Sequence, residues 1–273
     1  MSYPLFFGSS ETGTVREDNQ DAIRWHEPTD EPTQQNYGRL YAIADGMGGY
    51  EHGGVASTLA LETLFNTFYS GTPRKSPQNL KQGLQAANLA VYQTGQRLGT
   101  RMGTTLSAIN LIGSEVHIAH VGDSRIYHVH DRQAVCLTND HTMVGELVRM
   151  RVLPPDKVRT HDRRSVLQKC LGLDLFVQPD FSRYVINDDD YLILCTDGLW
   201  AFVEDDDFAQ IVTDVQEPQL VGQNLIELAL SRSSDDNLSV LVIQVQRPDV
   251  QSEQSPQPKG LRKLLFNRLS GKS

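Results

Sequence analysis

Short apolar runs alternate with longer stretches of helical periodicity along the chain, a pattern typical of a mixed α and β protein. Apolar positions recur at helical spacing in residues 54–69, 79–98, 142–151, 206–215 and 218–232. Runs typical of strands cover residues 22–26, 39–44, 104–112, 115–121, 125–130, 181–186, 191–196 and 238–245.

The connections between three consecutive strand-like runs indicate how a sheet is built. Residues 104–112, 115–121 and 125–130 are separated only by short segments around Gly113 and Gly122. A parallel pair of strands needs a crossover of about a dozen residues or more. We therefore expect these runs to be antiparallel hairpin neighbours, which argues against a Rossmann-type parallel sheet.

The composition fits a packed globular protein. The chain has 273 residues, of which 39% are hydrophobic. Its apolar runs are far shorter than the roughly 18 residues that cross a bilayer, and its first residues lack the pattern of a secretory signal. The three cysteines are too scattered for a disulfide framework or a zinc site. We expect reduced thiols and a cytoplasmic monomer.

Charge is distributed unevenly and separates a tail from the rest of the chain. Residues 247–273 contain six basic and two acidic residues and therefore carry a net charge of +4. Because the whole chain has a net charge of −9, residues 1–246 carry −13. We expect one catalytic-size domain, residues 1–246, and a disordered linker with a basic tail, residues 247–273. The tail is either solvated or docks transiently on an acidic partner or an anionic membrane. The acidic domain argues against sequence-independent nucleic-acid binding.

Several aspartates stand where apolar strands meet glycine or polar turns. They are Asp45, Asp123, Asp197 and Asp236. A single Asp-Gly pair is more typical of a turn than of a ligand. A short carboxylate on a rigid strand end nevertheless suits hard, oxygen-seeking cations such as Mg²⁺ and Mn²⁺. Their recurrence in one chain therefore indicates a metal site.

An earlier cluster, VREDNQD, places Arg16 shortly before Asp21 and the strand-like run at residues 22–26. The planar guanidinium of arginine can bind two phosphate oxygens at once. A carboxylate beside it can contribute to a metal site. A surface ion-pair cluster is the alternative interpretation.

These motifs resemble those of the metal-dependent type 2C serine/threonine protein phosphatases in their bacterial form. The resemblance covers nearly all of residues 8–246, in order, through VREDNQD, YAIADGMGG, MGTTLSAI, VGDSRIY, LTNDHT, LILCTDGLW and DDNLSVLVI. It implies an α+β fold, the αββα four-layer sandwich, in which two packed antiparallel β-sheets are flanked by helices.

The resemblance also implies a centre with two Mn²⁺ or Mg²⁺ ions. By this resemblance Asp45 bridges the two ions. Asp123 matches a position that helps to hold a third, weaker metal, and Arg16 matches the residue that binds the substrate phosphate. The ligands implied for the two ions are the main-chain carbonyl of Gly46 and four carboxylates, those of Asp21, Asp45, Asp197 and Asp236.

The activity implied is hydrolysis of phosphoserine and phosphothreonine in proteins by a water that the two metals activate. The partners implied are phosphorylated proteins and a cognate bacterial serine/threonine kinase, whose signalling the enzyme reverses. The alternative is a catalytically weak pseudophosphatase that acts as a phosphoprotein-binding regulatory module. Turnover of a phosphothreonine peptide with Mn²⁺ distinguishes the two.

The proton donor for the leaving group is left open by the sequence. Tyr50 stands where many bacterial members have a histidine. The candidates are His52, two residues further on, the phenol of Tyr50, which is a poor acid at neutral pH, and a water at the third metal, which Asp123 helps to hold. We favour the metal-bound water. Residues 144–171 correspond to the variable flap of the family, which either binds acidic phosphoproteins or is a solvated loop.

Four histidines on strand-like runs resemble a zinc cluster in composition. Residues i and i+3 of a strand point to opposite faces, so His117 and His120 cannot share a metal. We expect packing or hydrogen-bonding roles for the whole group, His117, His120, His128 and His130.

Overall fold

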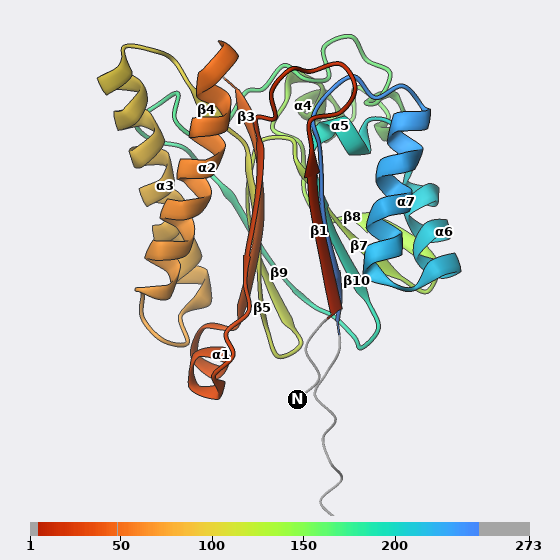
Figure 1. The fold of residues 1–273 in the computed structure, drawn as a ribbon, viewed down its shortest axis with the longest axis horizontal. Coiled ribbons are helices and arrows are strands. Elements are labelled where there is room, and N and C mark those ends of the chain that lie inside the picture. The colour runs from red at the N-terminus through yellow and green to blue at the C-terminus, as the bar shows by residue number, and fades with distance from the viewer. Residues whose placement is uncertain (1–4, 48, 246–273) are drawn as a thin grey trace, which may run out of the picture.

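Two antiparallel β-sheets pack face to face and helices cover the outer face of each, which makes the protein a four-layer α+β sandwich (Figure 1). The structure is a computed structural model that describes residues 5–47 and 49–245, with the main chain alone for residues 49–51. The predicted fold class is confirmed. The predicted linker and tail, residues 247–273, lie outside the described residues, and so does the side chain of Tyr50.

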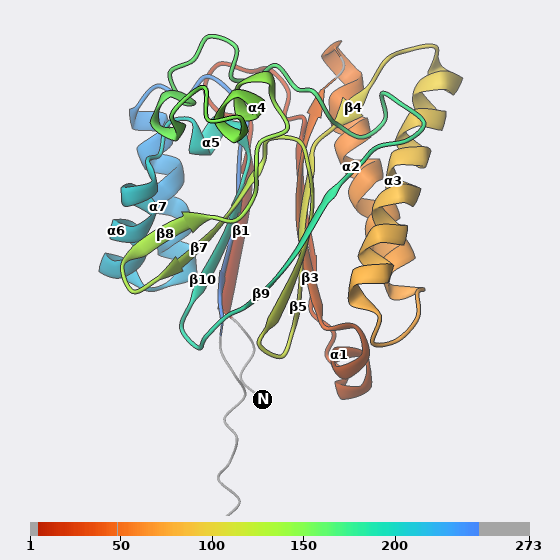
Figure 2. The same ribbon diagram turned by 180° about the vertical axis from the view of Figure 1, so that it is seen from behind.

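The two sheets, called here sheet A and sheet B, each draw strands from both halves of the chain. Sheet A runs in the order β1 (Leu5–Glu11), β11 (Leu238–Gln244), β10 (Tyr191–Cys195), β7 (Arg125–His130) and β8 (Gln133–Cys136). Sheet B runs in the order β2 (Asp21–His26), β3 (Arg39–Met47), β5 (Leu106–Ile112), β6 (Glu115–Val121) and β9 (Asp180–Val185), with β4 (Gly103–Thr104) beside β3. The edge strands β8 and β9 lie on the side seen in Figure 2.

Each sheet has its own pair of long helices. Sheet B is covered by α2 (Gly49–Tyr69) and α3 (Ser76–Leu98), and sheet A by α6 (Asp205–Val215) and α7 (Pro218–Ser231). The shorter helices are α1 (Glu31–Tyr37), α4 (Met143–Arg149), the 3₁₀ turn η1 (Pro155–Lys157) and α5 (Asp197–Trp200). In residues 5–47 and 49–245, none of the helices is long and apolar enough to cross a membrane.

The core of sheet B shows why its strands are continuous apolar runs. In β3, Leu40 and Ala42 belong to the cluster under α2 and α3, whereas Tyr41 and Ile43 belong to the cluster between the two sheets. Successive side chains of a strand point to opposite faces. A strand that is covered on both faces therefore shows a continuous apolar run and no alternation of polar and apolar residues.

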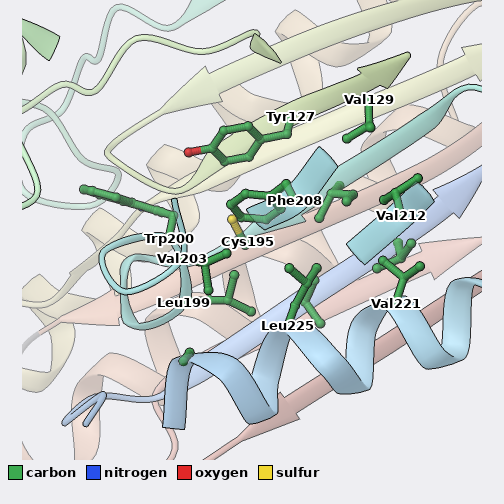
Figure 3. Close-up of a cluster of buried hydrophobic side chains, with 14 of the residues drawn as sticks. Tyr127, Val129, Cys195, Leu199, Trp200, Val203, Phe208, Val212, Val221 and Leu225 are labelled. Carbon is green, nitrogen blue, oxygen red and sulfur yellow. The ribbon is translucent and has the colours of Figure 1, made fainter. Parts of the chain in front are cut away.

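Sheet A has a corresponding cluster under α6 and α7 (Figure 3). Tyr127 from β7 and Phe208 from α6 stack with ring centroids 4.3 Å apart. Leu225 from α7 and Trp200 at the end of α5 are buried in the same cluster. This cluster reaches the end of the sandwich where α5 begins, and so it supports the functional site described below.

One predicted connection is wrong. The strands β5 and β6 form the expected antiparallel hairpin, but β7 belongs to the other sheet, where it pairs with β10 and β8. The segment from Gly122 to Ser124 therefore carries the chain from sheet B to sheet A. Gly122 has φ of +110°, a conformation that favours glycine. A short connection excludes a parallel neighbour, but it does not require the two strands to share a sheet.

The long predicted elements are confirmed, with ends that differ by a few residues. The sequence pattern missed β1, α1, β8 and the short turns η1 and α5. The edge strand β1 is only partly buried along most of its length, so its face has no regular apolar alternation. Residues 188 and 189 form the turn between β9 and β10, and Asp189 has φ of +65°.

Candidate active site

Carboxylates from both sheets meet at one end of the sandwich. Asp21 begins β2 and lies directly opposite Asp45 of β3 in the antiparallel register. In sheet A, Asp197 follows the end of β10 and Asp236 precedes the start of β11, and these strands are also antiparallel neighbours. The end of one strand and the start of its antiparallel neighbour share an edge. The strand directions therefore bring these aspartates to the same end of the sandwich, where these strands begin or end.

A cleft of about 890 Å³ opens between the two sheets at this edge. Its acidic lining includes Asp45, Asp123, Asp197 and Asp236. The flap contributes Ser165 and Leu167 to its wall. The cleft is further lined by Val15, Arg16, Glu17, Asp18, Gln20, Gly46, Met47, Leu173, Asp235 and Asn237.

Asp21 is fixed by hydroxyl groups from the opposite sheet. Thr196 Oγ1 and Ser239 Oγ both donate to its Oδ2, at 2.8 and 2.7 Å. Burial raises the pKa of Asp21 to about 7, and these two hydrogen bonds oppose that increase. The carboxylate of sheet B is thus oriented by side chains of sheet A. Sequence analysis missed both hydroxyls because nothing in their spacing distinguishes them from ordinary strand residues.

The other carboxyl groups are buried beside one another, which makes their ionisation costly. Burial, and then the neighbouring aspartates, raise the pKa values of Asp45 and Asp123 well above the usual range. Burial, and then Asp236, raise the pKa of Asp197 to about 6. A divalent cation would compensate this concentrated negative charge, and oxygen ligands are those that Mg²⁺ and Mn²⁺ prefer. The donor set therefore fits such ions.

The carboxylates nevertheless do not form a complete coordination sphere among the described residues. In the part of the chain that the structure describes, no three acidic, histidine or cysteine side chains are grouped closely enough to form a ready-made ion site. One of the acids has a different partner, because Arg16 Nη2 lies 2.8 Å from Asp236 Oδ2. The Arg16 side chain is 55% exposed at the mouth of the cleft.

Main-chain packing at Gly46 explains why glycine stands there. A Cβ atom at this position would lie 2.0 Å from the carbonyl oxygen of Gly53 in α2 and 2.7 Å from that of Gln20. The amide of Gly46 donates to the same Gln20 carbonyl, at 3.1 Å. This close approach brings the end of β3, the start of α2 and the loop before β2 together at the cleft.

Asn237, which sequence analysis did not single out, fixes the loop that carries Arg16. Its side-chain amide donates to the carbonyls of Thr12 and Asp18, and its Oδ1 accepts the amide of Gln20. The position next to Asp236 was the only available signal. A neutral amide beside a predicted ligand therefore holds the loop across the cleft from β11.

Asp123 lies on the crossing between the sheets. The residue is 3% exposed, and its carbonyl accepts the indole Nε1 of Trp200 at 2.9 Å. The structure thus brings Asp123 into the same cleft as Asp45 and Asp197. Its assignment to a third metal stays a prediction.

His52 lies in the first part of α2 and is partly buried. Among the described residues, it does not belong to the set that lines the cleft. The structure therefore gives no contact that favours His52 as the proton donor, and this role stays a prediction.

Three of the four strand histidines make hydrogen bonds, and His117 lies beside an acidic residue. His120 is buried and lies between the hydroxyl of Ser107, at 2.8 Å, and the carbonyl of Asn139, at 3.0 Å. Burial lowers its pKa to about 4. His128 and His130 both bind the carboxylate of Asp190, and His117 lies 3.5 Å from Glu115. The expected hydrogen-bonding roles are confirmed for His120, His128 and His130.

Comparison with known proteins identifies the family. A profile described as protein phosphatase 2C matches residues 14–225. The chain belongs to this family. The expectation of a protein phosphatase is thereby confirmed, and the four-layer sandwich is the fold that its relatives share.

The relatives resemble the chain over almost its whole described length. A putative protein phosphatase 2C-type of Streptococcus pyogenes is 30% identical over 246 residues, which are 89% of this chain and 98% of that protein. The crystal structure of the serine/threonine phosphatase PstP/Ppp of Mycobacterium tuberculosis has 29% identity and a TM-score of 0.77, with 90% of this chain and 100% of that one covered. A structure of the PstP catalytic domain in complex with two manganese ions has 28% identity, a TM-score of 0.77 and coverage of 89% and 98%.

Proposed function

We propose that this 2C phosphatase is a metal-dependent hydrolase of phosphoserine and phosphothreonine in proteins, and that it reverses the action of a bacterial serine/threonine kinase. The observation that carries the proposal is the convergence of acidic side chains from both sheets on one cleft, with an arginine at its mouth. The names of the relatives, which include serine/threonine phosphatases, support the same substrate class.

The residues that would hold two cations are those of the acidic edge. In this proposal Asp45 would be a ligand of both cations, and Asp21, the Gly46 carbonyl, Asp197 and Asp236 would supply the other ligands. When bound, Mn²⁺ or Mg²⁺ supplies a water that is nucleophilic near neutral pH and neutralises charge on the phosphate. The relative whose structure contains two manganese ions supports this stoichiometry.

The chain's own residues supply binding and orientation. Arg16 is exposed at the cleft mouth, so its guanidinium can leave Asp236 and bind two oxygens of an incoming phosphate. Thr196 and Ser239 hold the carboxylate of Asp21 in one orientation. The flap residues Ser165 and Leu167 border the opposite wall, where the polypeptide of the substrate would lie.

The test compares neighbouring acids in a phosphothreonine peptide assay with Mn²⁺. Asp45→Ala and Asp236→Ala should each lower turnover by about 10³-fold or more, because several kcal/mol of charge stabilisation depend on bound metal. Asp206→Ala is the control, since Asp206 is an exposed acid of α6 that does not line the cleft, and it should stay within about threefold of wild type.

Chelation separates this proposal from the regulatory alternative. Excess EDTA should abolish turnover and added Mn²⁺ should restore it. Full activity in EDTA would contradict the metal dependence. Tight phosphopeptide binding without any turnover in Mn²⁺ would instead identify a pseudophosphatase.

A further inference from the structure

Arg159, in the flap, makes an unusual number of contacts outside it. Its Nε donates to the carbonyl of Trp200 at 3.0 Å, and its Nη2 donates to the carbonyl of Val203 at 3.1 Å. The same Nη2 lies 2.6 Å from Asp205 Oδ1, and only 10% of the side chain is exposed. The residue before it, Val158, is buried in the cluster of sheet A. The flap is therefore fastened to the molecule at this point.

One of the two carbonyls that Arg159 binds belongs to Trp200, the last residue of α5, and the other belongs to Val203, three residues beyond the helix. A helix leaves its last carbonyls without partners inside the helix, and a cation there is favoured by the helix dipole. The single turn of α5 begins at the predicted ligand Asp197 and ends at Trp200. Arg159 thus stabilises the far end of the turn that carries Asp197.

Trp200 connects this anchor to the third predicted metal position. It is 1% exposed, and its indole donates to the Asp123 carbonyl. The guanidinium of Arg125 stacks on the indole, with Cζ 3.5 Å from the ring centroid, and binds both oxygens of Asp140.

Tyr127 joins the two arginines, because its hydroxyl accepts Arg125 Nη1 at 3.1 Å and lies 3.4 Å from Arg159 Nη2. Figure 3 shows the Tyr127 hydroxyl and the Trp200 ring at the same end of the buried cluster. The flap anchor and the Asp123 loop are therefore parts of one packed network.

We propose that Arg159 is a positioning residue of the active site: it fastens the flap to the end of α5 and so fixes Trp200 and the main chain of Asp123 relative to the flap wall of the cleft. The proposal rests on the proposed function for its kinetic consequence. A phosphopeptide bound in the cleft would reach the flap wall formed by Ser165 and Leu167, whereas a small phosphate ester would occupy less of the cleft. Arg159 should therefore affect binding of the peptide much more than binding of the ester.

The kinetic test compares Arg159→Met with Arg232→Met. Arg232, directly after the end of α7, is the matched control because it also binds this corner of the molecule, but its side-chain partners, the Phe202 carbonyl and Asp207, lie outside the flap. We expect Arg159→Met to raise KM for a phosphothreonine peptide about tenfold, which corresponds to about 1.4 kcal/mol. Its kcat/KM for p-nitrophenyl phosphate, and both parameters of Arg232→Met, should stay within about threefold of wild type.

The conservative variant Arg159→Lys keeps the charge but has no planar fork. It should raise the peptide KM less than Arg159→Met does, and it serves as the test variant if the methionine variant does not fold. Equal losses on peptide and ester, or an Arg159 effect no larger than that of Arg232→Met, would overturn the proposal.

A spectroscopic test does not depend on turnover. The chain has two tryptophans, and Trp25 lies partly exposed on β2, so Trp25→Phe leaves Trp200 as the only indole fluorophore. In that background we expect Mg²⁺ to change the Trp200 emission. Adding Arg159→Met should raise the Mg²⁺ midpoint at least about threefold, whereas adding Arg232→Met should not. Superimposable titrations of the three proteins would overturn the link to Asp123, even if the phosphatase proposal itself stands.

Discussion

Arg16 shows how one side chain can serve two partners. Its contact with Asp236 is an exposed ion pair, a class that contributes about 1 kcal/mol or less. A doubly charged phosphate offers two oxygens to the same guanidinium and makes a stronger, bidentate contact. The arginine is therefore free to exchange its carboxylate partner for substrate at little cost.

This exchange predicts the effect of replacing Arg16. Arg16→Ala should raise KM for a phosphothreonine peptide about tenfold with a smaller loss in kcat, because one charge-assisted contact disappears. Arg16→Lys keeps the charge but lacks the planar guanidinium, so its KM should lie between those of wild type and Arg16→Ala. Calorimetry with Mg²⁺ provides the control. If Arg16→Ala weakens metal binding and leaves KM unchanged, then Arg16 supports Asp236 and does not bind phosphate.

Among the elements, the crossing between β6 and β7 connects the two sheets at the site. It moves the chain between the sheets and places Asp123 at the turning point. A Cβ atom on Gly122 would lie 2.5 Å from Thr105 Cγ2 and 2.6 Å from Thr105 Cβ. Thr105 also supports the next part of the site, because its Oγ1 accepts the amide of Asp45 at 2.9 Å.

Two glycines that flank β6 make a matched pair for testing this element. Gly122 and Gly113 both have positive φ, but a Cβ atom on Gly113 meets nothing within 4 Å. Gly122→Ala should lower the free energy of unfolding by about 3 kcal/mol through strain and overpacking, and Gly113→Ala by about 1 kcal/mol through strain alone. Urea unfolding measures both. Equal losses would mean that the Thr105 contact relaxes without cost.

At the scale of the whole molecule, packing the two sheets together forces carboxylates into one buried edge. In the metal-free protein, burial of these carboxylates costs stability at pH values where they must ionise. The folded-state pKa of Asp21 is about 7, above the usual value of 3.8, so the folded state binds more protons than the unfolded state between these values. Ionisation of Asp21 therefore lowers the stability as the pH rises from about 4 to about 7.

Asp21→Asn tests this balance between stability and function. In EDTA the variant should match wild type at pH 4 and become more stable than wild type by up to about 4 kcal/mol at pH 8, where Asp21 is ionised. With Mg²⁺ at pH 8 the order should reverse, because the variant loses a charged ligand. Thermal unfolding at the two pH values, with and without metal, measures the effect. A stability difference that does not change with pH would contradict the burial argument.

The sequence by itself determined the parts of this protein that depend on local chemistry. Continuous apolar runs and helical spacing predicted the long strands and helices, because burial imposes those periods within each element. Acids at strand ends predicted which residues meet, since rigid strands carry their end residues to a common edge. The family resemblance predicted the four-layer architecture, and it assigned roles to residues that single-motif reasoning had left as turns.

Only the tertiary structure decided contacts between residues far apart in the chain. The hydroxyls on Asp21 come from residues 175 and 218 positions away, and the partner of Arg16 is 220 positions away. The crossing of the chain from β6 in sheet B to β7 in sheet A, and the hydrogen bond of Arg159 to the end of α5, were likewise decided only by the tertiary structure. Sequence periodicity reports which side of an element is buried, but it does not report what lies against that side. Threonine, serine and arginine acquire these roles only when two sheets, each assembled from both halves of the chain, pack together.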